Sequence, residues 1–142
     1  MVFSRRTGYA VGCLILMALV MVSAALAHHS FAVYDHTKTL ILNGKVTKFQ
    51  WTNPHAFLEI DVQDAKGAVK HYTLECTSIN MMQRLGWRSN MIKAGDQVKA
   101  IAAPLLSGQP GGLLLEVTLA SGEKRELGVP ASNTFKRTAE QE

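Results

Sequence analysis

The sequence predicts an all-β (β-rich) fold with one short helix, arranged as a small five-stranded Greek-key barrel of the oligonucleotide/oligosaccharide-binding (OB) type. Three observations lead to this prediction. Apolar and polar residues alternate with the period of two that a half-buried strand requires. Glycine, proline and asparagine separate the alternating segments. These segments follow one another as three strands, one helix and two strands, the element order of such a barrel, while a plain β-sandwich is the alternative.

The five expected strands alternate in hydropathy and are bounded by turn residues. They cover residues 40–51, 56–63, 69–76, 97–103 and 113–120. Within the first, Val46 and Phe49 are three residues apart, so both face one core only if the register shifts between them. Gly44 in the same strand indicates a bulge or a sharp bend. Residues 105–112 carry three glycines and a proline, and we expect them to form a hairpin loop.

One helix is expected between the third and fourth strands. Thr77 or Ser78 is its N-cap, and Gly86 is its stop signal. Its apolar stripe consists of Ile79, Met82 and Leu85. Of the adjacent residues Met81 and Met82, we expect one to face the core and the other the solvent.

The domain organisation is a signal peptide at 1–27, a barrel domain at 28–128 and a flexible polar tail at 129–142. Arg5 and Arg6, a 12-residue apolar run and the Ala25–Ala27 ending are typical of a cleaved secretory signal, and an uncleaved membrane anchor is the alternative. Cleavage would leave 115 residues with 13 basic and 11 acidic side chains, a net charge of +2 instead of +4. The remaining charges are interspersed, so no nucleic-acid partner is expected. The predicted location is the periplasm, with no stable membrane span after cleavage.

Histidines suggest a metal site. Cleavage after Ala27 would give His28 a free α-amine beside its imidazole, and these two nitrogens can chelate one ion. His55, and after it His29, are the candidates that would complete a nitrogen-rich site. Such ligation suits Cu(II), so copper is the candidate metal.

The loop Trp51–His55 is a second candidate for ligand binding. Trp51 could stack on a small ligand while Asn53 and His55 make polar contacts. The alternative is that Trp51 closes the barrel end and Asn53 bonds its own turn.

Polar side chains also share the outward face of two strands that we expect to pair. They are Glu59, Asp61, His71, Thr73 and Glu75. A carboxylate facing an imidazole could act as an acid/base pair, although solvated sheet faces commonly carry such residues without a function. No nucleophile, zinc-protease or phosphate-loop motif occurs, so no catalytic residue is assigned. Cys76 is expected to be a small buried side chain.

Several short motifs carry a resemblance to a known family. They are HHSFA from His28, Tyr34–Asp35, Gly44–Val46, the WTNPH loop Trp51–His55, Leu85–Trp87 and Gly95–Asp96. Together they resemble a family of small exported bacterial proteins of unknown function. This resemblance implies an exported single-domain protein and transfers no activity.

The expected function is therefore a non-enzymatic binding module of the periplasm, which binds a metal ion or a small ligand through His28, His29, His55 and the loop. The alternative is an accessory or interaction subunit of a cell-envelope complex without a ligand of its own. That subunit would use an exposed sheet edge or the glycine-rich loop.

Overall fold

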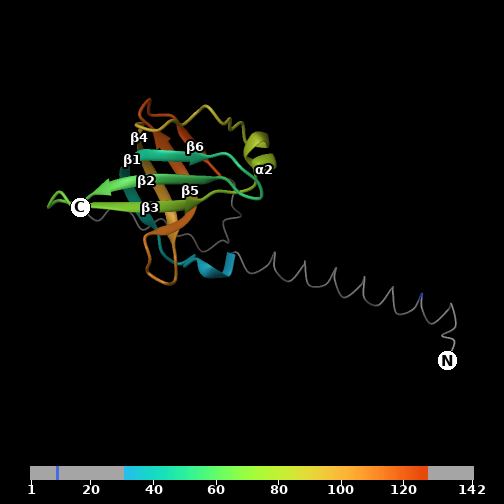
Figure 1. Cartoon of the computed structure of the whole chain (residues 1–142), viewed down its shortest axis with the longest axis horizontal. Coiled ribbons are helices and arrows are strands. Elements are labelled where there is room, and N and C mark those ends of the chain that lie inside the picture. The colour runs from blue at the N-terminus through green and yellow to red at the C-terminus, as the bar shows by residue number, and fades with distance from the viewer. Residues whose placement is uncertain (1–8, 10–30, 128–142) are drawn as a thin grey trace. The chain divides into compact units, whose positions relative to one another are not determined.

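The computed structural model describes Tyr9 and residues 31–127, and it confirms a closed β-barrel of five strands with one short helix (Figure 1). The elements are η1 (Phe31–Val33), β1 (Leu40–Gln50), β2 (Phe57–Gln63), β3 (Val69–Glu75), α2 (Ile79–Arg84), β4 (Gln97–Pro104), β5 (Gly111–Leu119) and β6 (Lys124–Glu126). Apart from Tyr9, the predicted signal peptide lies outside the described residues, and so do His28, His29 and the tail at 129–142. Within residues 31–127, no helix is long and apolar enough to cross a membrane.

The strands are hydrogen-bonded in the order β3-β2-β1-β4-β5-β6. All neighbours in this order are antiparallel. The barrel closes where β3 pairs with β5 in parallel, with Thr73 opposite Gly111 and Glu75 opposite Leu113. This closure puts the end of β3 between β2 and β5, so the backbone of Glu75 is held from both sides.

The long strand β1 serves both halves of the barrel. Its first half pairs with β4 and its second half with β2. The register shifts between Val46 and Lys48, which confirms the predicted irregularity and lets both Val46 and Phe49 contact the core. A Cβ on Gly44 would lie 2.7 Å from the Asp61 carbonyl oxygen, so glycine is what allows β2 to approach here.

The core is formed by inward-facing strand residues and is closed at one end by α2 (Figure 1). Met82 of α2 and Trp87 after it are both fully buried, whereas Met81 is exposed, as predicted for this pair. The Trp87 indole Nε1 donates to the Glu126 carbonyl oxygen at 3.1 Å, which satisfies its polar group. Ser78 is the N-cap, because its side chain accepts from the Met81 amide.

Three details differ from the expectations. Gly111 and Gly112 belong to β5 rather than to a loop, because β5 passes so close to β4 that a Cβ on Gly112 would lie 2.4 Å from the Ala103 carbonyl oxygen. The polar strand β6 has no alternating apolar pattern and was not expected. Leu85 is 39% exposed, because α2 ends at Arg84 before the stripe completes another turn.

Candidate functional site

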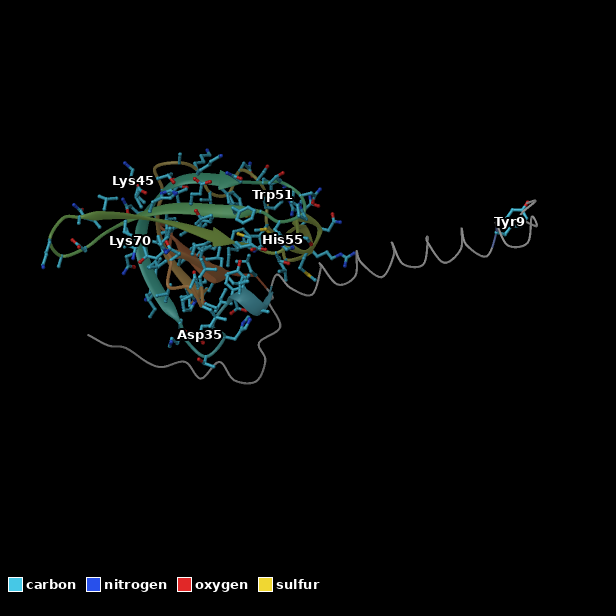
Figure 2. All side chains as sticks on the ribbon, turned by 60° about the horizontal axis from the view of Figure 1, so that its bottom comes forward. Tyr9, Asp35, Lys45, Trp51, His55 and Lys70 are labelled. Atoms are coloured by element: carbon cyan, nitrogen blue, oxygen red, sulfur yellow. The ribbon has the colours of Figure 1, made fainter. Side chains whose placement is uncertain are left out.

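His55 lies in the loop between β1 and β2, directly before a fixed stretch of backbone. Ala56 is fully buried, and its carbonyl oxygen accepts from the Cys76 amide at 2.8 Å. The Asn53–Pro54 peptide bond in this loop is cis. Figure 2 shows His55 at the same end of the barrel as Trp51 and away from Lys45 and Lys70. The imidazole is 29% exposed, so it is both supported by the fold and accessible.

Glu75, the last residue of β3, contacts this imidazole. Its Oε1 is hydrogen-bonded to Nδ1 of His55, and its Oε2 accepts from the hydroxyl of Tyr34. The carboxylate is 19% exposed. We call Tyr34, Glu75 and His55 the rim cluster.

Tyr34 enters the rim cluster from the segment before β1. It forms an isolated antiparallel bridge with Leu105, and the next amide, of Asp35, donates to the Pro104 carbonyl oxygen at 2.8 Å. Its ring packs with Ala103 and Leu113 in a small cluster separate from the main core. Burial, with the adjacent Glu75 carboxylate as a second cause, raises the pKa of Tyr34 well above its ordinary value. Tyr34 therefore keeps its proton at neutral pH and donates a hydrogen bond to Glu75.

The sequence did not predict this role for Tyr34, which is 41 residues from Glu75. Glu75 was named, but on the polar face around His71. On that face, Nδ1 of His71 lies 2.7 Å from an Asp61 oxygen, and its Nε2 lies 3.6 Å from a Glu59 oxygen. Among the described residues, His55 and His71 are thus each paired with a carboxylate, and Glu75 belongs to the pair with His55.

The other loop residues lie near His55 in the chain but have different surroundings. Trp51 packs edge-on against Phe49, with ring centroids 5.6 Å apart, and is partly buried against the core. Asn53 is exposed. Their binding of a ligand, together with His55, stays a prediction.

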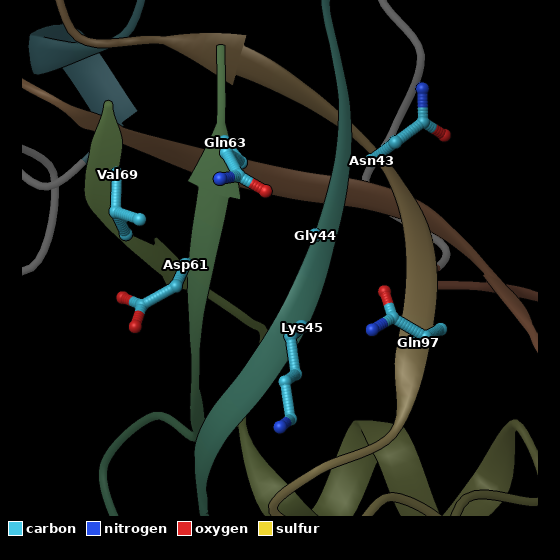
Figure 3. Close-up of a pocket in the computed structure, with 7 residues that line it drawn as sticks. All are labelled: Asn43, Gly44, Lys45, Asp61, Gln63, Val69 and Gln97. Atoms are coloured by element: carbon cyan, nitrogen blue, oxygen red, sulfur yellow. The ribbon is translucent and has the colours of Figure 1, made fainter. Parts of the chain in front are cut away.

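A polar hollow of about 320 Å³ lies on the barrel wall around Gly44 (Figure 3). Asp61 of β2, Lys45 of β1 and Gln97 of β4 lie in one row across it, because Lys45 is the register partner of both. The hollow is open to solvent and contains no residue of the rim cluster. It is therefore a feature of the sheet surface rather than an extension of the site.

Of the three predicted metal ligands, only His55 lies among the described residues. Among the described residues, no group of three or more His, Cys, Asp or Glu side chains could hold a metal ion. Cys76 is buried, and burial raises the pKa of its thiol to about 12. A metal binds the thiolate, so Cys76 is not suited to the role. A site at His55 would need ligands from outside the described part of the chain, as the prediction with His28 and His29 supposes.

Fold and site define a small OB-like barrel with a histidine–carboxylate–tyrosine cluster at its rim. A family of unknown function (DUF6152) matches residues 16–117, and the chain belongs to this family. This agrees with the resemblance seen in the sequence motifs. Neither the curated proteins nor the solved structures gave a match.

Proposed function

We propose that this protein is an exported, non-enzymatic binding module of the periplasm, which binds a metal ion through His55 together with His28 and His29. The observation that carries the proposal is the anchoring of the His55 ring. Metal-binding histidines commonly donate one ring N–H to a carboxylate, which orients the other nitrogen toward the metal. Glu75 supplies such a carboxylate, and the ring is still partly exposed.

The chain length between the predicted terminus and the rim cluster supports this ligand set. His28 is six residues before Tyr34, which is held in place by backbone bonds around Leu105 and Pro104. Six residues span at most roughly 20 Å, at about 3.3–3.6 Å each. The hydroxyl of Tyr34 and the ring of His55 contact the same carboxylate, so His28 is only six residues of chain away from a member of the rim cluster. A tether of this kind raises the effective concentration of the second ligand.

Copper is the metal that the proposed donor set favours. A terminal amine, the imidazole of the same residue and the Nε2 of His55 would give nitrogen ligation in one plane, which Cu(II) prefers. Trp51 and Asn53, from the loop that carries His55, would border the same site and provide contacts for a small ligand. The donor set depends on cleavage after Ala27, because a terminus shifted by one residue would separate the amine from the imidazole of His28.

The experiment is a calorimetric titration of the mature protein with Cu(II) and Zn(II), after intact mass has established that the chain begins at His28. We expect His55→Ala to weaken Cu(II) binding at least 10-fold. His71→Ala is the matched control, because His71 is also paired with a carboxylate but lies on the sheet face. If His55→Ala binds Cu(II) as tightly as the wild type, the shared site is wrong.

A second candidate function is that of an interaction subunit, and the free edge of β3 favours it. Residues Thr73–Glu75 pair with β5, whereas Val69–Tyr72 have a strand partner among the described residues on the β2 side only. Val69 is 62% exposed. An extended segment of an envelope protein could add to this edge. A stoichiometric partner that is lost on Val69→Lys and kept on His55→Ala would support this function over metal binding.

A further inference from the structure

Glu75 lies between one phenol and one imidazole and accepts a hydrogen bond from each. We infer that Glu75 and Tyr34 are positioning residues that hold His55 in the tautomer with its proton on Nδ1, which leaves the Nε2 lone pair as the ligand-binding atom. The tautomer follows from the described contacts alone, whereas its use for a metal depends on the proposed function. The inference also sets the class of ligand, which is a cation or a neutral hydrogen-bond donor.

The direction of the bonds follows from what each group can donate. An ionised carboxylate only accepts, so a group that bonds to it must supply the proton. Tyr34 does so because its buried phenol keeps its proton. The same reasoning assigns the proton of neutral His55 to Nδ1, which is bonded to Oε1 of Glu75. Nε2 then carries the lone pair, and none of the described residues is bonded to it.

The backbone fixes the distance between Glu75 and His55. The Cys76 amide donates to the Ala56 carbonyl oxygen, and these two residues directly follow Glu75 and His55 in the chain. Glu75 is also the register partner of Phe57 on one side and Leu113 on the other. Both residues are therefore attached to paired backbone, which keeps their side chains within hydrogen-bonding reach of each other.

Tyr34 fixes the remaining freedom, which is the rotation of the carboxylate. Its hydroxyl holds Oε2, so Oε1 is directed toward His55. The ring of Tyr34 is itself packed against Ala103 and Leu113. Tyr34 therefore acts on His55 through Glu75 and has no need to touch the ligand.

The charge of the rim cluster determines what can bind. Tyr34 and the proposed form of His55 are neutral, and Glu75 brings one negative charge that is only 19% exposed. A partly buried carboxylate is weakly screened and repels an approaching anion. Nε2 offers a lone pair, which suits a metal cation or a donor group on a neutral ligand and disfavours phosphate or carboxylate ligands.

The first experiment measures the tautomer in the metal-free mature protein by long-range ¹H–¹⁵N correlation at pH 8. The wild type should show a protonated Nδ1 and an unprotonated Nε2 at His55. Glu75→Met removes the acceptor at similar side-chain length and should move the proton to Nε2 in most molecules. Glu59→Met is the matched control, because Glu59 lies beside His71 and not beside His55. A wild-type ring with a proton on Nε2, or a Glu75→Met ring that keeps the wild-type form, overturns the inference.

The second experiment repeats the Cu(II) and Zn(II) titrations on folded Glu75→Met and Tyr34→Phe. Loss of a carboxylate behind a metal-binding histidine weakens metal binding by about 10–100-fold, which is the effect expected for Glu75→Met. Tyr34→Phe should have a smaller effect, because Glu75 is retained. If the wild type binds neither metal but shows the expected tautomer, the proposed function fails and the positioning role stands. If the metal binds equally well to the wild type and Glu75→Met, the positioning role is overturned.

Discussion

Replacing Tyr34 with phenylalanine tests the rim cluster through protein stability. The change removes the hydroxyl that donates to Glu75 and keeps the ring that packs against Ala103 and Leu113. A hydrogen bond to a charged group contributes about 1.5–3 kcal/mol. In Tyr34→Phe, Glu75 keeps its hydrogen bond to His55 and some exposure to water. We therefore expect the free energy of unfolding to fall by about 1–2 kcal/mol, at the lower end of this range. For a domain of about 100 residues, each kcal/mol lowers the Tm by about 4–8 °C.

The pH dependence of this loss distinguishes the proposed contact from simple packing. Burial and Glu75 raise the pKa of Tyr34 in the folded protein, while in the unfolded chain the phenol ionises near its ordinary pKa of 10.0. A group with a raised folded pKa contributes its full stability below the unfolded value and loses it as the pH rises. The wild type should therefore lose stability above pH 10, because Tyr34 ionises in its unfolded chain, and Tyr34→Phe has no phenol at this position to ionise. The difference in the free energy of unfolding between the wild type and Tyr34→Phe should decrease by about 1.4 kcal/mol from pH 9 to pH 11.

Urea unfolding followed by circular dichroism at pH 8, 9, 10 and 11 measures this gap, with equal m-values as the check that both proteins unfold alike. Tyr72→Phe is the control, because it removes a phenol from the same barrel without touching Glu75. A gap between the wild type and Tyr34→Phe that stays constant from pH 8 to pH 11 would refute the buried, proton-donating role of Tyr34.

Three further predictions concern the rest of the fold. Hydrogen bonds from Thr37, with Lys38 as a second cause, lower the pKa of Asp35 to about 2. In thermal melts, the wild type should therefore be more stable than Asp35→Asn above pH 4, and this difference in stability should vanish as the pH falls from 4 to 2. The thiol of Cys76 is buried and kept protonated, so Ellman's reagent should modify it only at the rate of unfolding, and rapid labelling at pH 8 would contradict this burial. Gly112→Ala should cost about 1–3 kcal/mol in urea melts, because its Cβ meets the carbonyl oxygen of Ala103, and an unchanged midpoint would show that β4 and β5 separate easily.

The fold could be predicted from the sequence because most of its strands can be recognised from their own pattern of apolar and polar residues. Leu58 and Ile60 alternate with Glu59 and Asp61, and turn residues flank the segment, so strand, face and end are all visible in eight residues. The strand β6 gives no such signal. Its three polar residues are ordered by pairing with β5, a contact that only the completed barrel provides.

The candidate site was predictable only in part. His55 was singled out because Asn53 and Pro54 present it on a loop that connects two strands. Its partner Glu75 could not be predicted, because Glu75 and His71 both lie on the outward face of β3 and either could contact a residue of the neighbouring strand. The register decides between the possible pairs, since a slip of one residue would turn each side chain to the other face. Asp61 is opposite His71, and Phe57 is opposite Glu75, which makes His55 the diagonal neighbour of Glu75.

The environment of each pair then explains why one is a candidate site and the other belongs to the solvated surface. His71 and Asp61 are 49% and 40% exposed, so water screens their interaction and a surface pair of this kind contributes little. His55 and Glu75 are 29% and 19% exposed, and Tyr34 covers the far oxygen of the carboxylate. Hydrogen bonds that are shielded in this way hold a ring in one orientation, which a binding site requires and a sheet surface does not. Tyr34→Ala should expose the contact between Glu75 and His55 to water. In NMR relaxation measurements, the His55 ring should then become about as mobile as the ring of His71. If the mobility of the His55 ring is unchanged, Glu75 alone holds it.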